Sequence, residues 1–109
     1  MEDFLSQVKD QNLPFTEIIQ YIENNYKVSP TAFQNGDAYN SETQNQGSAK
    51  VLYFAKLLNL SKEDTLLLFA EHYQSVLADP EGDNHQNIRQ FMKNGWEGVR
   101  FEGIVLEKK

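Results

Sequence analysis

The side chains best suited to chemistry lie just after the acidic turn at residues 79–83. His85, Asn87 and Arg89 occupy alternate positions there. A histidine acts as a general base only when a second group orients its ring and a pocket admits the substrate. The sequence identifies neither that group nor that pocket. We therefore interpret His85 as a hydrogen-bonded structural residue beside the apolar residues Ile88 and Met92.

A second polar group lies at the start of a predicted helix, in the run Gly47-Ser48-Ala49-Lys50. Free backbone amides at a helix start can hold an anion, and Lys50 would add positive charge. The run lacks the glycine and lysine spacing of a nucleotide-binding P-loop. A helix capped by Ser48, with Lys50 in solvent, explains the same residues and is the preferred interpretation.

These polar residues would form one site if the fold brought them together. One group comes from the loop and the helix start after Phe33, where Asn40 also lies, and the other from the later helix. Their convergence would create a pocket rich in amides with two cations. The candidate pocket residues are Asn35, Asn45, Gln46, Ser48, Lys50, His85, Asn87 and Arg89.

A metal site is not expected from the sequence. No His-x-x-x-His or Glu-x-x-His spacing places two ligands on one helix face, so His72 is interpreted as structural. Asp79 opens a pattern like that of a calcium loop. However, Asn84 and Gln90 stand where that loop needs glycine and glutamate. We expect no metal and no cofactor.

Composition limits the class of protein. The length of 109 residues suits one domain over residues 1–109, and 39% hydrophobic residues are enough for a core. The chain has no cysteine, which excludes disulfides and thiolate chemistry. A net charge of −6 argues against a nucleic-acid partner, because phosphate backbones are bound mainly by clustered lysine and arginine. No apolar run approaches the ~20 residues that span a bilayer, so no membrane association is expected.

The first third of the chain predicts two helices and a short extended segment. Apolar spacing from Phe4 to Val8 indicates a helix that ends near Pro14. Thr16 is the expected N-cap of a second helix, which would close at Asn24-Asn25. Residues 26–28 are predicted to be extended.

The segment from Gln34 to Ser48 is polar, with a turn signal at Asn35-Gly36. Loops of this length are either functional or disordered, and composition leaves both possibilities open. Ser48 is the expected N-cap of a helix with an apolar face over residues 51–58.

The strongest helical prediction covers Leu66 to Leu77, which we expect to form one central, heavily buried helix. The run Ser61–Asp64 predicts a capping box at its start. Asp79–Gly82 fits a type I turn. Asp83 is the expected cap of a short helix that Gly95 would end.

The tail changes to the two-residue period of strands. Segments 99–101 and 104–106 flank Glu102-Gly103 and predict a small hairpin, with residues 26–28 as a further pairing partner. Trp96 is expected in the core. The predicted fold class is therefore α+β, a helix-rich single domain with a small antiparallel sheet or hairpin near the C-terminus.

Three stretches also carry a family resemblance. They are SPTAFQNG at 29–36, NQGSAK at 45–50, and a long stretch with EHY at 71–73, VLADPEG at 76–82, HQNIRQFM at 85–92 and GWEGVRF at 95–101. Their order and spacing resemble the HopJ type III effector family of small bacterial proteins. The resemblance covers almost the whole chain and implies a single HopJ-like domain.

The resemblance implies a place of action but no reaction. The family is named after effectors of plant-pathogenic bacteria, so a bacterial cytoplasmic protein that a type III system exports to a host cell is implied. Ala49 stands where the family pattern often has cysteine, which excludes thiol chemistry at that position. The preferred function is a non-enzymatic interaction protein with a bacterial or host protein partner. Its oligomeric state is left open.

Two alternatives accompany this interpretation. The first is a small ligand-binding protein or enzyme with a polar pocket around His85, Asn87, Arg89 and Lys50. The second is a metal-dependent protein that uses His72 or His85. A deep pocket would favour the first alternative, whereas an exposed apolar patch on a flat face would favour a protein partner.

Overall fold

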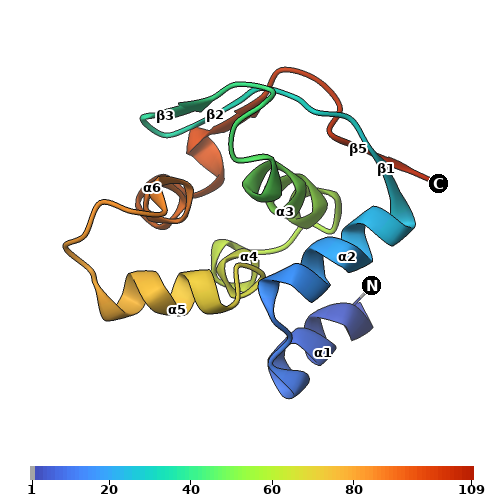
Figure 1. Ribbon diagram of the computed structural model, residues 1–109, viewed down its shortest axis with the longest axis horizontal. Coiled ribbons are helices and arrows are strands. Elements are labelled where there is room, and N and C mark those ends of the chain that lie inside the picture. Colours follow the sequence, from blue (N-terminus) through green and yellow to red (C-terminus); the bar gives the residue numbers. More distant parts are fainter. Residues whose placement is uncertain (1) are drawn as a thin grey trace.

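The computed structural model describes residues 2–109 of the chain. Its helices, shown in Figure 1, are α1 (Glu2–Gln11), α2 (Phe15–Asn25), α3 (Gln46–Leu57), α4 (Lys62–Leu67), α5 (Glu71–Ala78), α6 (Gln86–Asn94) and the short 3₁₀ helix η1 (Gly95–Gly98). Together with small antiparallel sheets, they confirm the predicted helix-rich α+β class. No helix in the described part of the chain is both long and apolar enough to cross a membrane.

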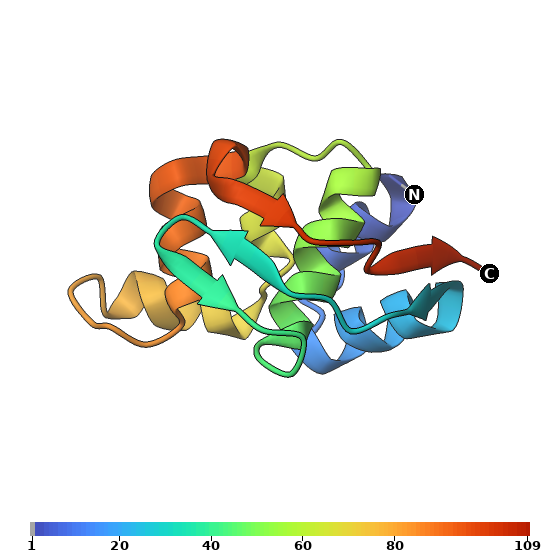
Figure 2. The same cartoon turned by 90° about the horizontal axis from the view of Figure 1, so that it is seen from above.

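Two small sheets cover one side of the helices. Strand β1 (Tyr26–Val28) pairs antiparallel with β5 (Leu106–Lys108). The other sheet has the order β3 (Ala38–Asn40), β2 (Phe33–Asn35), β4 (Val99–Phe101), again antiparallel throughout. Figure 2, seen from above, shows the three-stranded sheet lying across α3 and α6, with the β1–β5 pair farther right, beside the end of α2.

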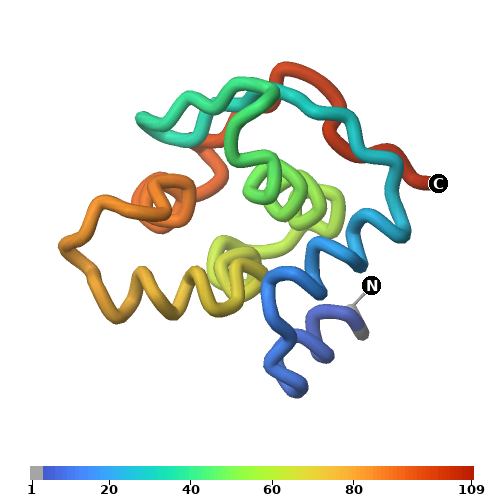
Figure 3. Tube along the Cα trace, in the orientation of Figure 1, coloured from blue at the N-terminus to red at the C-terminus, as the bar shows by residue number. Residues whose placement is uncertain are grey.

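The predicted hairpin between residues 99–101 and 104–106 does not form. Strand β4 pairs with β2, whereas the chain beyond it runs on to pair with β1. Residues 26–28 are thus a pairing partner of the C-terminal segment, as predicted, but in place of the hairpin and not in addition to it. A two-stranded hairpin is marginally stable by itself. The observed partners are instead held against the helices, and Val105 is buried where Ser29 donates a hydrogen bond to its carbonyl at 2.8 Å. The trace in Figure 3 shows the C-terminal segment passing from one sheet to the other.

Helix α3 is the centre of the core. Its buried residues are Ala49, Val51, Leu52, Phe54 and Ala55. Rings from other elements surround Phe54, with Phe4, Tyr21 and Tyr26 all within 6.0 Å of it between ring centroids. Full burial of one such side chain contributes about 1.5–3 kcal/mol. The core is therefore built around α3 and not around the segment from Leu66 to Leu77.

That segment is not one helix, so the strongest helical prediction is wrong. Helix α4 ends at Leu67 and α5 begins at Glu71, with a sharp turn at Ala70, where φ is 53° and ψ is −124°. Leu68 and Phe69 are buried in the turn itself. Because a buried corner is apolar on every side, its sequence is the same as that of a buried helix.

Several predicted helix caps are also wrong. Helix α2 begins before Thr16, and α3 begins before Ser48. Helix α6 begins at Gln86, beyond the position that Asp83 would cap. None of the three predicted residues is therefore the N-cap. The N-caps of α3 and α6 are Asn45 and His85, both with φ of 52°. Ser61 is confirmed as the cap of α4, since its hydroxyl accepts a hydrogen bond from the Asp64 amide at 3.1 Å.

The predicted turns agree with the structure, unlike most of the predicted N-caps. Gly36 has a φ of 57° in the tight turn between β2 and β3, and Gly95 ends α6 with a φ of 63°. The Gly82 amide donates to the Asp79 carbonyl at 3.1 Å, as the predicted turn requires. The expected close of α2 at Asn24-Asn25 is right in position, but these residues are not left-handed because the helix passes directly into β1.

Candidate functional site

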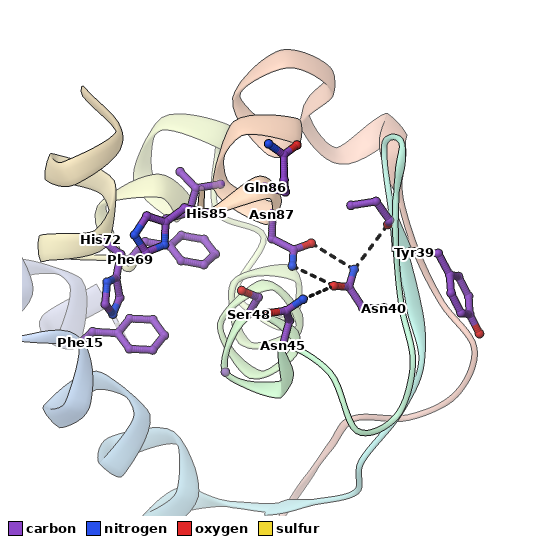
Figure 4. Close-up of a pocket in the computed structure, with 13 residues that line it drawn as sticks. Phe15, Tyr39, Asn40, Asn45, Ser48, Phe69, His72, His85, Gln86 and Asn87 are labelled. Carbon is purple, nitrogen blue, oxygen red and sulfur yellow. Dashed lines mark hydrogen bonds between the residues drawn. The ribbon is translucent and has the colours of Figure 1, made fainter. Parts of the chain in front are cut away.

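A cavity of about 510 Å³ lies between α2, α3, α5, α6 and β3. We call it the central cleft, and Figure 4 shows its walls. The lining residues are Phe15, Ala38, Tyr39, Asn40, Asn45, Gly47, Ser48, Phe69, His72, His85, Gln86, Asn87 and Ile88. They come from distant parts of the chain, so the cleft exists only in the folded protein.

One wall of the cleft is made of rings. The centroids of His72 and His85 are 5.1 Å apart, with the ring planes tilted by 38°. His72 also meets Phe15 edge to face at 4.8 Å, and Phe15 stacks near Phe69 at 6.2 Å. Neither imidazole forms a hydrogen bond within the described part of the chain. This wall offers apolar ring faces and two imidazoles whose nitrogens are free to bind a ligand.

The opposite wall is a cluster of asparagine amides. Asn87 Nδ2 donates to Asn40 Oδ1 at 3.0 Å, and Asn40 Nδ2 donates to Asn87 Oδ1 at 3.1 Å. Asn45 Nδ2 extends the cluster to Asn40 Oδ1 at 2.6 Å. Behind it, the wholly buried Asn35 donates to both the side-chain and the backbone oxygen of Asn87, at 3.0 and 2.8 Å. These bonds fix the position of β3 and of both helix starts around the cleft.

The cluster leaves two amide oxygens without a partner in the described residues. Asn35 Oδ1 is buried, and an unmet buried acceptor costs about 1–3 kcal/mol. Asn45 is exposed at the cleft, and its oxygen accepts no bond there. The Asn45 oxygen and the Ser48 hydroxyl are therefore open to a ligand on this side.

Four helices begin at the cleft. Phe15 opens α2, the segment 45–48 opens α3, His72 lies in the first turn of α5, and residues 85–88 open α6. A helix start carries a partial positive charge and amides without intrahelical acceptors. No acidic side chain lines the cleft among the described residues. The helix starts therefore contribute partial positive charge to the cleft, although the chain as a whole is acidic.

The nearest carboxylate is Glu71, at the margin of the cleft. Burial raises the pKa of Glu71, but hydrogen bonds from the backbone of Phe15 and Glu71 and the positive charge of His72 outweigh burial. The pKa of Glu71 is therefore held below its usual value. Its Oε1 accepts the Phe15 amide at 2.8 Å and caps α2, which leaves less of this charge to act on the cleft.

The sequence-predicted pocket residues are only partly brought together. Asn45, Ser48, His85 and Asn87 line the cleft, and Asn35 lies directly behind it. Gln46 instead ties the loop after β3 to Thr31, to which it is bonded at 3.0 and 3.2 Å.

The two expected cations lie elsewhere. Lys50 forms a 2.8 Å ion pair with Glu23 on α2. Arg89 binds Asn84 and the Pro80 carbonyl, and so holds the loop between α5 and α6. Neither residue lines the cleft, so the partial positive charge at the cleft comes from the helix starts.

The predicted pocket lacked several lining residues, among them Phe15, Phe69, His72 and Gln86. His72 is interpreted from the sequence as structural, and it lies within the predicted helix from Leu66 to Leu77. The turn at Ala70 turns it toward His85 instead. The residues after Phe69 include none of the usual turn formers before Ser75, so no local signal marks this turn. Groups of three or more His, Asp or Glu able to hold a metal were not found among residues 2–109.

Fold and site together define a small α+β domain with a ligand-sized cleft. The profile of the family described as HopJ type III effector protein matches residues 1–106, and the chain belongs to this family. The crystal structure of the unknown-function protein VPA0580 is similar over 100% of this chain and 93% of that one, with 40% identity and a TM-score of 0.92. Among curated proteins no significant match was found. The family membership confirms the resemblance carried by the three sequence stretches.

Proposed function

We propose that this HopJ-family protein binds a small ligand in the central cleft. The observation that carries the proposal is the pairing of two walls across one cavity: imidazole and phenyl rings on one side, asparagine amides on the other. The volume of about 510 Å³ falls within the usual range of ligand sites. A few polar groups among apolar rings are also what such sites use for orientation.

Binding is favoured over catalysis by the environment of the histidines. A catalytic imidazole is normally oriented by a carboxylate or carbonyl that accepts its second N–H. The described residues provide no such hydrogen bond to His72 or His85. The carboxylate of Glu71 accepts a hydrogen bond from the Phe15 amide instead. The chain itself would therefore act as a receptor for the ligand.

The family supports a setting for this activity. HopJ proteins are described as type III effectors, so we propose that the protein acts after export from the bacterial cytoplasm into a host cell. The cleft ligand would then be a host or bacterial small molecule.

A protein partner is the second candidate function. Leu77 on α5 is 48% exposed and, with Pro80 and Met92, lines a separate depression of about 320 Å³. A large exposed leucine in a depression is typical of an anchor site for a partner. Replacement of Leu77 by serine should release a captured bacterial or host protein, whereas Ser48→Leu in the central cleft should not.

The ligand proposal is tested by fragment binding followed through backbone amide resonances. Fragments should shift the amides of residues 45–48 and 85–88 in the wild-type protein. Ser48→Leu places an apolar side chain in the cleft and should abolish these shifts while the protein stays folded. Ser75→Leu, the same change at an exposed site on α5, is the matched control. Fragment binding that persists in Ser48→Leu would refute the proposed site.

A further inference from the structure

We propose that the ligand of the central cleft carries an anionic oxygen group, a carboxylate or a phosphate, which binds against the imidazole pair. This inference deepens the proposed ligand-binding function and rests on it. The anion would bind in the space between His72, His85 and the first turns of α3 and α6, and we call this space the seat.

The histidine pair is the main feature of the seat. The ring centroids are 5.1 Å apart, so both imidazoles can contact one bound group. An anion placed against both rings accepts hydrogen bonds from them. Bonds from a protonated imidazole to an anion are charge-assisted and stronger than those between neutral groups. The pair is therefore suited to an anion.

The helix starts add donors at the same place. Helices α3 and α6 have 12 and 9 residues, and each begins after a left-handed residue whose side chain makes no cap bond. The amides of Gly47, Ser48, Gln86 and Asn87 therefore have no acceptor within the described chain. By contrast, α2 and α4 are capped by Glu71 and Ser61. The chain leaves uncapped the two helix starts that line the cavity beside the histidines.

The surrounding charges favour the same ligand. Among the described residues of α2, α3, α5, α6 and β3 that line the cleft, the imidazoles are the titratable groups apart from the Tyr39 phenol. The Tyr39 ring turns away from the amide cluster in Figure 4. Glu71 borders the site on α5 and is held by the Phe15 amide, while Lys50 is paired with Glu23. Among the described residues, no carboxylate inside the seat therefore competes with an anionic ligand.

The pH dependence follows from the histidines. A protonated imidazole donates a charge-assisted hydrogen bond to an anion, which a neutral imidazole cannot. Because histidine side chains in general carry more positive charge at lower pH, an anion is expected to bind more tightly at pH 5.5 than at pH 8. The phenyl rings of Phe15 and Phe69 beside the seat suit a ligand whose anionic group is attached to an apolar or aromatic body.

The test compares benzoate with benzamide, which have the same shape and differ in charge. Binding to the wild-type protein is measured by amide shifts at pH 5.5 and pH 8, at constant ionic strength, with inorganic sulfate as the phosphate-like probe. We expect benzoate to bind roughly tenfold more tightly than benzamide at pH 5.5, which corresponds to one charge-assisted bond. That preference should shrink at pH 8. If sulfate causes saturable amide shifts, the anionic group of the ligand is a phosphate. If benzoate causes amide shifts and sulfate does not, the group is a carboxylate.

Variants separate this inference from the proposed function. His85→Gln and His72→Gln should each reduce the benzoate preference and flatten its pH dependence. Lys27→Gln removes one positive charge at an exposed position of strand β1 and should change neither. Equal binding of benzoate and benzamide at both pH values in the wild-type protein would overturn the inference and leave the binding function standing. If no fragment binds in the cleft, both the inference and the proposed binding function are overturned.

Discussion

The backbone amide of Phe15 donates a hydrogen bond of 2.8 Å to the carboxylate of Glu71, 56 positions further along the chain. This contact caps α2 from another helix, which is why Thr16 is not needed as a cap. It also joins the starts of α2 and α5. Because Phe15 and His72 lie directly beside it, the contact holds the aromatic wall of the central cleft together.

Removal of this cap should lower stability. Glu71→Gln weakens the charge at the start of α2, and Glu71→Ala removes the acceptor altogether. The contact is exposed, so we expect a loss of about 0.5–1 kcal/mol in the free energy of unfolding for the alanine variant. Glu17→Gln in the first turn of α2 is the control and should cost less. Urea denaturation measures both.

The same contact predicts a dependence of stability on pH. The pKa of Glu71 is lowered in the folded protein, so its stabilising effect is complete above the pKa of the unfolded chain. It is lost as pH falls through the folded pKa. The difference in unfolding free energy between wild type and Glu71→Gln should therefore be present at pH 7 and vanish at pH 2–3. A difference that grows on acidification would contradict the assigned contact.

The asparagine cluster predicts a large effect at one buried residue. Asn87→Ala removes three side-chain hydrogen bonds from the buried cluster, two with Asn40 and one with Asn35. We expect a loss of about 2–4 kcal/mol. Gln86→Ala, at the exposed neighbour, should stay within about 0.5 kcal/mol. Thermal and chemical unfolding of the two variants compare them directly.

The turn at Ala70 predicts a stabilising substitution. A φ of 53° with ψ of −124° is unfavourable for alanine, because its Cβ crowds the backbone there. Ala70→Gly should stabilise the protein by about 0.5–1 kcal/mol. Ala78→Gly, at the end of α5, has ordinary helical geometry and should instead destabilise it by a similar amount. A loss of stability in Ala70→Gly would show that this turn is not strained.

The features predicted correctly from the sequence are those that depend on residues close together along the chain. Ser61 has its acceptor and donor within one helical turn, and the glycines at 36 and 95 adopt conformations that other residues avoid. These features were correctly placed. The fold class followed from the spacing of apolar residues, and the family followed from the three conserved-looking stretches.

The rest depends on contacts between distant residues. The buried corner at Leu68 and Phe69 has the same apolar pattern as a continuous helix, so it was missed. The pairing of β1 with β5 is decided by how the ends of the chain pack on α3. The amide wall of the cleft and His85 were predicted from the sequence. The aromatic wall was not, because Phe15 and His72 meet only after the turn at Ala70 has formed.

The most direct test of the central claim is a crystal structure of the protein soaked with a mixture of small aromatic acids and amides. The account predicts difference density for a bound molecule between His72, His85 and Asn87. Density for these compounds at other sites, with ordered water alone in the central cleft, would contradict it.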